Sequence, residues 1–272
     1  MRGRRRIGQT PGMAPKTRKY DDAKIRAAVI AQFGHVGRAV GQLEPEQLQR
    51  PSGLGDWTVA DLAAHIAWIA DSLAAGLARP PAAVPELTAV EWPFATASLA
   101  GKISEAARET LAGAPLPELY DRAAAALARE LAANRGGRVL QLWIGDMTLA
   151  DFLVTRTVEL VVHTDDLNRA AGLDIPIERQ ALAACTRLLA DALALRAPGG
   201  SVEVRIPPFA VVQCIEGPRH TRGTPPNVVE TDPLTWIRLA TGRTSWDAAL
   251  DGGRVRAGGE RADLSALLPL MS

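Results

Sequence analysis

Residues 149–171 read LADFLVTRTVELVVHTDDLNRAA, and this stretch decides the fold. Its aliphatic side chains fall on most sides of a helix, so the pattern predicts a central, buried helix. Thr148 stands directly before it and Asp151 three residues later, which is the spacing of a helix N-cap. Gly172 follows at a position where glycine commonly ends a helix. The sequence therefore predicts a helical domain built around this segment.

Four ionisable residues interrupt this apolar pattern at spacings of three, four and three: Arg156, Glu159, His163 and Asp166. These spacings place all four on one face of the helix. Burying them costs free energy unless each is paired or bound to a metal ion. Glu159 and His163, one turn apart, can point at one cation. A ladder of Arg156–Glu159 and His163–Asp166 ion pairs without metal explains the same spacing, so both interpretations stay open here.

A third ligand is expected on a neighbouring helix, and His65 is the best candidate. Thr58 and Asp61 repeat the capping pattern, which predicts a helix from Thr58 to about Leu77. His65 lies two turns into that helix, on its apolar stripe. A lone histidine there is more often a core residue, but a buried Glu-x-x-x-His elsewhere favours ligation. Two imidazoles and one carboxylate suit zinc and leave a fourth position open, as in catalytic zinc sites.

Asp166 and Arg156 receive supporting roles in this interpretation. Asp166, one turn beyond His163, is expected to hold a ligand imidazole from outside rather than to bind the metal itself. Arg156 either pairs with Glu159 or holds a carboxylate of a substrate. A metal bound by one carboxylate and two neutral imidazoles keeps a net positive charge, which lowers the pKa of a bound water or thiol.

The remaining sequence divides into a helical part and a mixed part. Helical periodicity covers about 21–43, 96–111 and 117–134, and one more helix is expected at about 178–195. Alternating, β-branched segments then predict strands at 201–206, 209–216, 228–231 and 254–257, with short helices at 233–241, 245–250 and 262–268. We therefore expect a disordered basic tail at 1–19, a helical bundle at 20–173 and a small α+β domain at 174–272.

Composition excludes several function classes. Of the 272 residues, 47% are hydrophobic and 22% charged, which is ordinary for a soluble globular protein. No uninterrupted apolar run reaches the roughly 18–20 residues of a membrane-spanning helix. Seven basic residues precede Asp21, and the rest of the chain has 24 basic against 30 acidic residues, which argues against nucleic-acid binding. Met13 is an alternative start. Cys185 and Cys214 have no metal or redox spacing and are expected to be reduced core residues of a cytoplasmic protein.

Two segments resemble the signature of the mycothiol-dependent maleylpyruvate isomerase family. They are residues 55–65, GDWTVADLAAH, and residues 156–167, RTVELVVHTDDL. The resemblance extends in order and spacing over about 21–172. It implies a DinB-like four-helix bundle with a zinc site made of one histidine on the second helix and Glu-x-x-x-His on a later one. The ligands of the family match His65, Glu159 and His163 position by position.

A third segment, residues 232–243 with the sequence DPLTWIRLATGR, resembles the small sterol-carrier-type domain that often follows this bundle in actinobacterial proteins. An ordinary helix with Trp236 in the core and Gly242 at its end explains the same residues. Arg238 and Arg243 are interpreted as solvent-facing side chains rather than as an anion site. His220 is interpreted as an exposed loop residue, and His35 is given no role.

The family resemblance implies that the metal holds the thiol of mycothiol, a sugar-linked cysteine thiol, as a thiolate. Attack on a small electrophilic substrate would then give isomerisation by addition–elimination, or transfer of the thiol. The implied partner is a small molecule rather than a nucleic acid or a membrane. Fold does not fix the substrate. Two other classes stay open: a sterol-carrier-like protein that binds a lipid or another apolar ligand beside a non-catalytic metal-binding bundle, and a metal-binding interaction module without chemistry.

Overall fold

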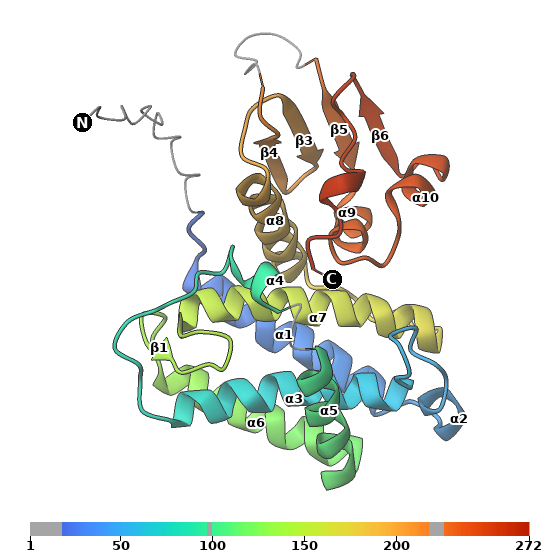
Figure 1. Cartoon of the computed structure of the whole chain (residues 1–272). Helices are drawn as coiled ribbons and strands as arrows, with labels where there is room; N and C mark the ends of the chain where they lie inside the picture. Colours follow the sequence, from blue (N-terminus) through green and yellow to red (C-terminus); the bar gives the residue numbers. More distant parts are fainter. Residues whose placement is uncertain (1–17, 97–99, 218–225, 272) are drawn as a thin grey trace, which may run out of the picture.

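The computed structural model describes residues 18–96, 100–217 and 226–271. Of residues 100–104 it describes the backbone alone. The fold is mostly helical, with a small C-terminal domain that contains a sheet. Figure 1 shows a layer of long helices at the bottom and the sheet with its helices above them. Among the described residues, no helix combines the length and the apolar character that crossing a membrane requires.

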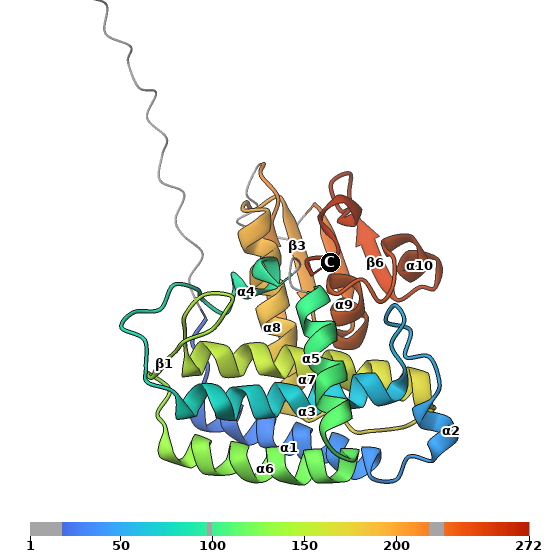
Figure 2. The ribbon, with the colours of Figure 1, turned by 60° about the horizontal axis from the view of Figure 1, so that its bottom comes forward.

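Within the described residues, four long helices form the bundle: α1 (Asp22–Val40), α3 (Val59–Ala78), α6 (Leu116–Ala133) and α7 (Leu149–Ala171). Both α1 and α3 pack against α6 and against α7. A further helix, α5 (Ala100–Gly113), packs on α3 and crosses it on the outside of the bundle, as Figure 2 shows. The DinB-like bundle predicted from the sequence is therefore the observed architecture.

The caps predicted for α3 and α7 are present. Thr58 and Asp61 form a reciprocal capping box: the Thr58 hydroxyl accepts from the Asp61 N–H at 3.2 Å, and the Asp61 carboxylate accepts from the Thr58 N–H at 2.8 Å. Thr148 accepts from the Asp151 N–H at 3.1 Å at the start of α7. Gly172 ends α7 in the left-handed conformation, with φ of 70°. These caps fix where both site-bearing helices begin.

The C-terminal part is joined to the bundle by α8 (Arg179–Arg196), which packs on α7 and α1 and also on β4 and α9. The sheet has the strand order β4-β3-β5-β6, with only the β3–β5 pair parallel. Its strands are β3 (Val202–Ile206), β4 (Ala210–Cys214), β5 (Val228–Thr231) and β6 (Val255–Gly258), and its other helices are α9 (Pro233–Ala240) and α10 (Trp246–Asp251).

The prediction of a last helix at 262–268 is wrong. Only a single 3-10 turn, η2 (Ser265–Leu267), forms there. Leu268 is extended, with φ of −114° and ψ of 144°, because the proline ring of Pro269 disfavours helical backbone at the residue before it. The apolar spacing of this segment therefore serves packing without a helix.

Several short elements had no signal in the sequence. They are α2 (Pro45–Leu48), α4 (Trp92–Ala95), and the antiparallel hairpin of β1 (Val139–Leu140) and β2 (Met147–Thr148). Elements of two to four residues are too short to show a period. The two strands are joined by the hairpin loop, residues 141–146, of which 141–144 line a cavity of the bundle.

Candidate metal centre

His65, Glu159 and His163 lie together where α3 packs on α7. One ligand atom of each lies within 4.8 Å of those of the other two. His163 Nε2 is 3.2 Å from Glu159 Oε2, and His65 Nε2 is 3.6 Å from the same oxygen. The two imidazole rings are perpendicular, with centroids 4.9 Å apart. Both histidines are buried and Glu159 is partly exposed. A histidine from α3 and a glutamate–histidine pair from α7 thus surround one point.

Asp166 sets the protonation of the His163 ring. Nδ1 of His163 lies 3.1 Å from Asp166 Oδ2. A carboxylate can only accept, so Nδ1 donates and, in a neutral ring, Nε2 carries a lone pair toward Glu159. A lone pair and a carboxylate repel each other unless a proton or a cation lies between them. Two imidazole nitrogens and one carboxylate oxygen are a donor set that a divalent transition metal accepts, so these residues fit such an ion.

In the absence of metal, the pKa values of His65, Glu159 and His163 are all shifted from their ordinary values. Burial would lower the pKa of His163, but its hydrogen bonds with Asp166 and Glu159 outweigh burial and raise it. Burial lowers the pKa of His65, and the hydrogen bond with Glu159, which raises it, is too weak to offset this effect. Burial would raise the pKa of Glu159, but hydrogen bonds with His163 and His65 hold it well below its ordinary value. Of the three groups, His163 is therefore the one whose surroundings favour its protonated form.

The alternative ion-pair ladder is also present in part. Arg156 Nη2 lies 3.9 Å from Glu159 Oε1, which is too long for a hydrogen bond. Arg156 instead donates from Nε and Nη2 to the Thr155 hydroxyl, at 3.2 and 3.1 Å. The ladder accounts for His163 and Asp166, but it gives no reason for a buried histidine from α3 to face Glu159. The position of His65 therefore favours ligation.

The interpretation of Arg238 and Arg243 as solvent-facing residues is wrong. Arg238 donates from Nε and Nη2 to the two oxygens of Asp165, at 2.8 and 2.6 Å. Arg243 Nη2 donates to Asp166 Oδ2 at 2.9 Å, and Arg169 bonds the other Asp166 oxygen. The C-terminal domain thus holds the carboxylate that orients His163.

Sequence reasoning missed Asp165 altogether and did not connect Asp166 with Arg243. The adjacent pair of acids on α7 was the available signal, but their partners lie 73 and 77 residues away. Burial would raise the pKa of Asp166, but hydrogen bonds with His163 and Arg243 hold it well below its ordinary value. Asp166 therefore stays ionised, as the supporting role expected from the sequence would require.

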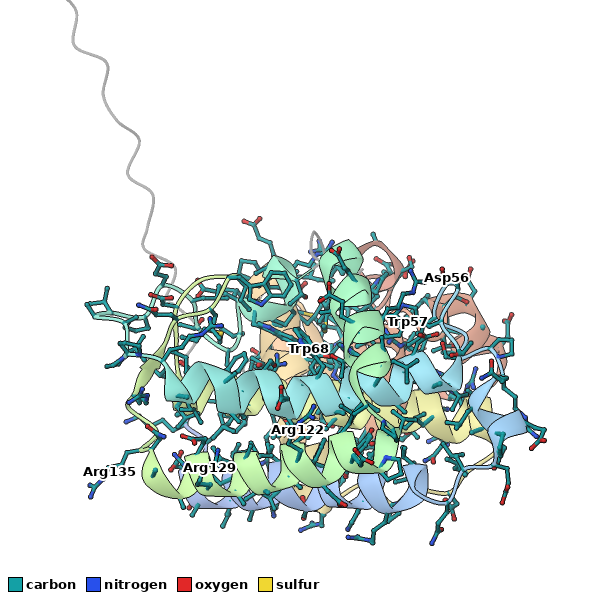
Figure 3. The ribbon with its side chains drawn as sticks, turned by 90° about the horizontal axis from the view of Figure 1, so that it is seen from below. Asp56, Trp57, Trp68, Arg122, Arg129 and Arg135 are labelled. Carbon is teal, nitrogen blue, oxygen red and sulfur yellow. The ribbon has the colours of Figure 1, made fainter. Side chains whose placement is uncertain are left out.

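A cavity of about 450 Å³ reaches the cluster from outside. His65, Glu159 and Arg156 line it, together with one face of α3, residues of the hairpin loop, and three aromatic or polar residues from other elements. The α3 residues are Trp68, Asp71, Ser72, Ala75 and Gly76, with Arg79 directly after the helix; the loop residues are 141–144, and the others are Trp92, Thr96 and Phe152. In Figure 3, Trp68 lies beside the middle of α3 and Trp57 nearer its start. Their ring centroids are 5.8 and 5.2 Å from that of His65.

The remaining candidates lie away from the cluster. His35 Nδ1 is 3.1 Å from the carbonyl oxygen of Pro176, on a different surface of the bundle. Cys185 and Cys214 are free and buried, as expected for core residues. His220 lies outside the described residues.

Comparison with known proteins finds two family models. Residues 31–168 match the mycothiol maleylpyruvate isomerase N-terminal domain, and residues 178–270 match the bacterial SCP ortholog family. Crystal structures of the mycothiol-dependent maleylpyruvate isomerase and of a mutant of it superpose with a TM-score of 0.57. Each match covers 90% of this chain and 95% of that chain at 16% identity, so it shows the fold alone. Comparison with curated proteins found no match.

Proposed function

Because this chain belongs to the mycothiol maleylpyruvate isomerase N-terminal domain family, we propose that it is a metal-dependent enzyme that uses mycothiol. The proposed reaction is an isomerisation, or a thiol transfer, on a small electrophilic substrate. The observation that carries the proposal is the cluster of His65, Glu159 and His163, of which His65 and Glu159 line a cavity that admits a small molecule.

The proposed ligands are Nε2 of His65, the carboxylate of Glu159 and Nε2 of His163. A divalent ion, with zinc preferred for this donor set, would supply a Lewis acid that favours the thiolate form of a bound thiol. Asp166 holds the His163 ring in the tautomer that presents Nε2, and Arg243 and Arg169 hold Asp166 in turn. Arg156 lines the cavity beside Glu159, and its proposed role is to orient an anionic substrate.

Metal content of the full-length protein tests the ligand set. Freshly purified protein should contain about one equivalent of zinc, because three protein ligands form a complete catalytic-type site. His65→Ala and Glu159→Gln should each lose it, whereas His35→Ala, a histidine remote from the cluster, should keep it. Wild-type protein without metal, or a His65→Ala variant with undiminished metal, would contradict the ligand assignment.

Cobalt substitution tests the use of a thiol. The visible spectrum of cobalt-loaded protein should change on titration with mycothiol, because a thiolate that joins the coordination sphere adds charge-transfer bands. Mycothiol with its sulfur methylated should leave the spectrum unchanged. An identical response to both compounds, or no response to mycothiol, would count against a thiol-dependent enzyme.

The match of residues 178–270 to the bacterial SCP ortholog family favours one alternative function. In that case the C-terminal domain binds a lipid or another apolar ligand, and the metal-binding bundle is not catalytic. Organic extraction of the purified protein followed by mass spectrometry distinguishes the two. A stoichiometric apolar ligand that is retained equally in His65→Ala would support the carrier.

A further inference from the structure

Aromatic residues are scarce in this chain but are concentrated at one place. They make up 4% of the sequence, twelve residues in all, and four of the twelve line the cavity: Trp68, Trp92, Trp143 and Phe152. Flat apolar side chains gathered in a concave site provide stacking surfaces for a flat ligand. The aromatic walls therefore indicate that the ligand has a flat, aromatic part.

Trp143 is the most informative of the four, because 52% of it is exposed. It belongs to the hairpin loop 141–146, whose backbone is fixed: the Asp146 carbonyl accepts from the N–H groups of Glu86 and Leu87, at 2.7 and 3.0 Å. Asp146 Oδ1 also accepts from the Leu142 N–H, at 3.2 Å. The loop thus presents a large exposed apolar ring at the cavity from a fixed backbone, as binding sites do.

Arg156 provides the charge in the same cavity. It is buried, and its guanidinium lies 4.3 Å from the Phe152 ring centroid and 5.4 Å from that of Trp92. Its hydrogen bonds go to the neutral Thr155 hydroxyl, and the nearest carboxylate, Glu159, is 3.9 Å away. A planar guanidinium held in this way is preorganised for the two oxygens of a carboxylate. If Glu159 binds a metal ion, its carboxylate would also neutralise less of the positive charge of Arg156.

We propose that the cavity selects an electrophile with an aromatic body and a carboxylate, the ring against the indoles of Trp143 and Trp68 and the carboxylate at Arg156. That the ligand is an electrophile rests on the proposed function, whereas recognition of its ring and carboxylate does not. A small aliphatic acid leaves the indole surfaces in water. A neutral aromatic compound leaves the buried guanidinium without its anion.

Three probes separate these features: cinnamate, its neutral amide cinnamamide, and the aliphatic dicarboxylate maleate. Their binding to the full-length protein is measured by calorimetry, with and without zinc. Cinnamate should bind at least about tenfold more tightly than either of the others, because only it uses both the stacking and the guanidinium contacts. Arg156→Gln should bring the affinity for cinnamate down to that for cinnamamide.

Substitutions of Trp143 test the aromatic wall. Trp143→Ala should weaken cinnamate binding about two- to tenfold, the loss of one aromatic pair, and leave maleate unchanged. Trp143→Phe should keep most of the affinity, and Trp143→Leu, which keeps an apolar side chain but has no aromatic ring, should lose it. Phe94→Ala is the matched control, because Phe94 is 38% exposed and lies outside the residues that line the cavity.

Equal affinity of the wild type for cinnamate and maleate would overturn the inference. So would an equal loss of both probes in Trp143→Ala and Trp143→Leu, which would show that Trp143 only shapes the loop. A protein that prefers cinnamate but neither holds metal nor responds to mycothiol would refute the proposed function and support this inference. A protein that holds metal and responds to mycothiol but prefers maleate would support the proposed function and refute this inference.

Discussion

His163 is the residue on which the candidate site depends most. Its ring has a carboxylate at each nitrogen: Asp166 at 3.1 Å from Nδ1 and Glu159 at 3.2 Å from Nε2. The first contact fixes the ring and the second faces the proposed metal position. A support of this kind orients a ligand imidazole and raises its basicity. The two carboxylates therefore have different roles, although both contact the same side chain.

Asp166→Asn tests the supporting role. An asparagine keeps the size of the side chain but accepts the Nδ1 proton less strongly, so zinc affinity should fall about 10- to 100-fold. The stoichiometry at saturating zinc should stay at one equivalent, since the three ligands remain. Competition against a chromophoric chelator measures the affinity. Asp121→Asn, on the exposed face of α6, is the control, and an unchanged affinity in Asp166→Asn would refute the role.

The sequence alone identified the three candidate ligands because helical spacing converts directly into geometry. Glu159 and His163 are one turn apart on α7, and their convergence follows from that spacing. His65 was reachable through its cap, which fixed the helix and therefore its apolar face. Trp143 and the other loop residues were not reachable, because a two-residue strand leaves no pattern from which to place a loop.

At the scale of elements, the N-caps of α3 and α7 do most to place the site. The α3 cap uses both groups of Thr58, its hydroxyl and its N–H, with Asp61. Predictions from cap and periodicity together succeeded for α3 and α7, where both signals agree. The prediction at 262–268 rested on apolar spacing alone and ignored Pro269, whose effect on the preceding backbone outweighed it.

Thr58→Ala should lower the free energy of unfolding by about 1 kcal/mol, the usual cost of losing an N-cap hydroxyl. Thr58→Ser, which restores the acceptor, should recover most of this. Urea unfolding followed by circular dichroism measures both variants at fixed zinc concentration. A Thr58→Ala protein as stable as the wild type would show that packing against α6 and α7 holds the start of α3 without the cap.

At the scale of the whole molecule, the two parts of the chain are connected through the site. The carboxylates of Asp165 and Asp166 on α7 pair with Arg238 and Arg243 from the C-terminal domain. We propose that the chain divides near residue 173, with α8 counted in the C-terminal domain although it also packs on α7 and α1. These long-range pairs could not be predicted, since no local pattern links segments more than seventy residues apart.

Arg238→Gln should destabilise the contact between α7 and the C-terminal domain, because it removes the bidentate hydrogen bonds to the buried carboxylate of Asp165. The free energy of unfolding should fall by about 1–3 kcal/mol, the range for hydrogen bonds to charged groups. Arg256→Gln, an exposed arginine on β6, should change it by less than about 0.5 kcal/mol. Equal stability of the two variants in urea would mean that Arg169 alone satisfies Asp165.

The most direct test of the central claim is a crystal structure of the zinc-loaded protein with data collected at the zinc absorption edge. The anomalous map should show one peak between α3 and α7, about 2.0–2.2 Å from Nε2 of His65, Nε2 of His163 and a carboxylate oxygen of Glu159. A map without a peak there, or with its peak on other side chains, would contradict the assignment.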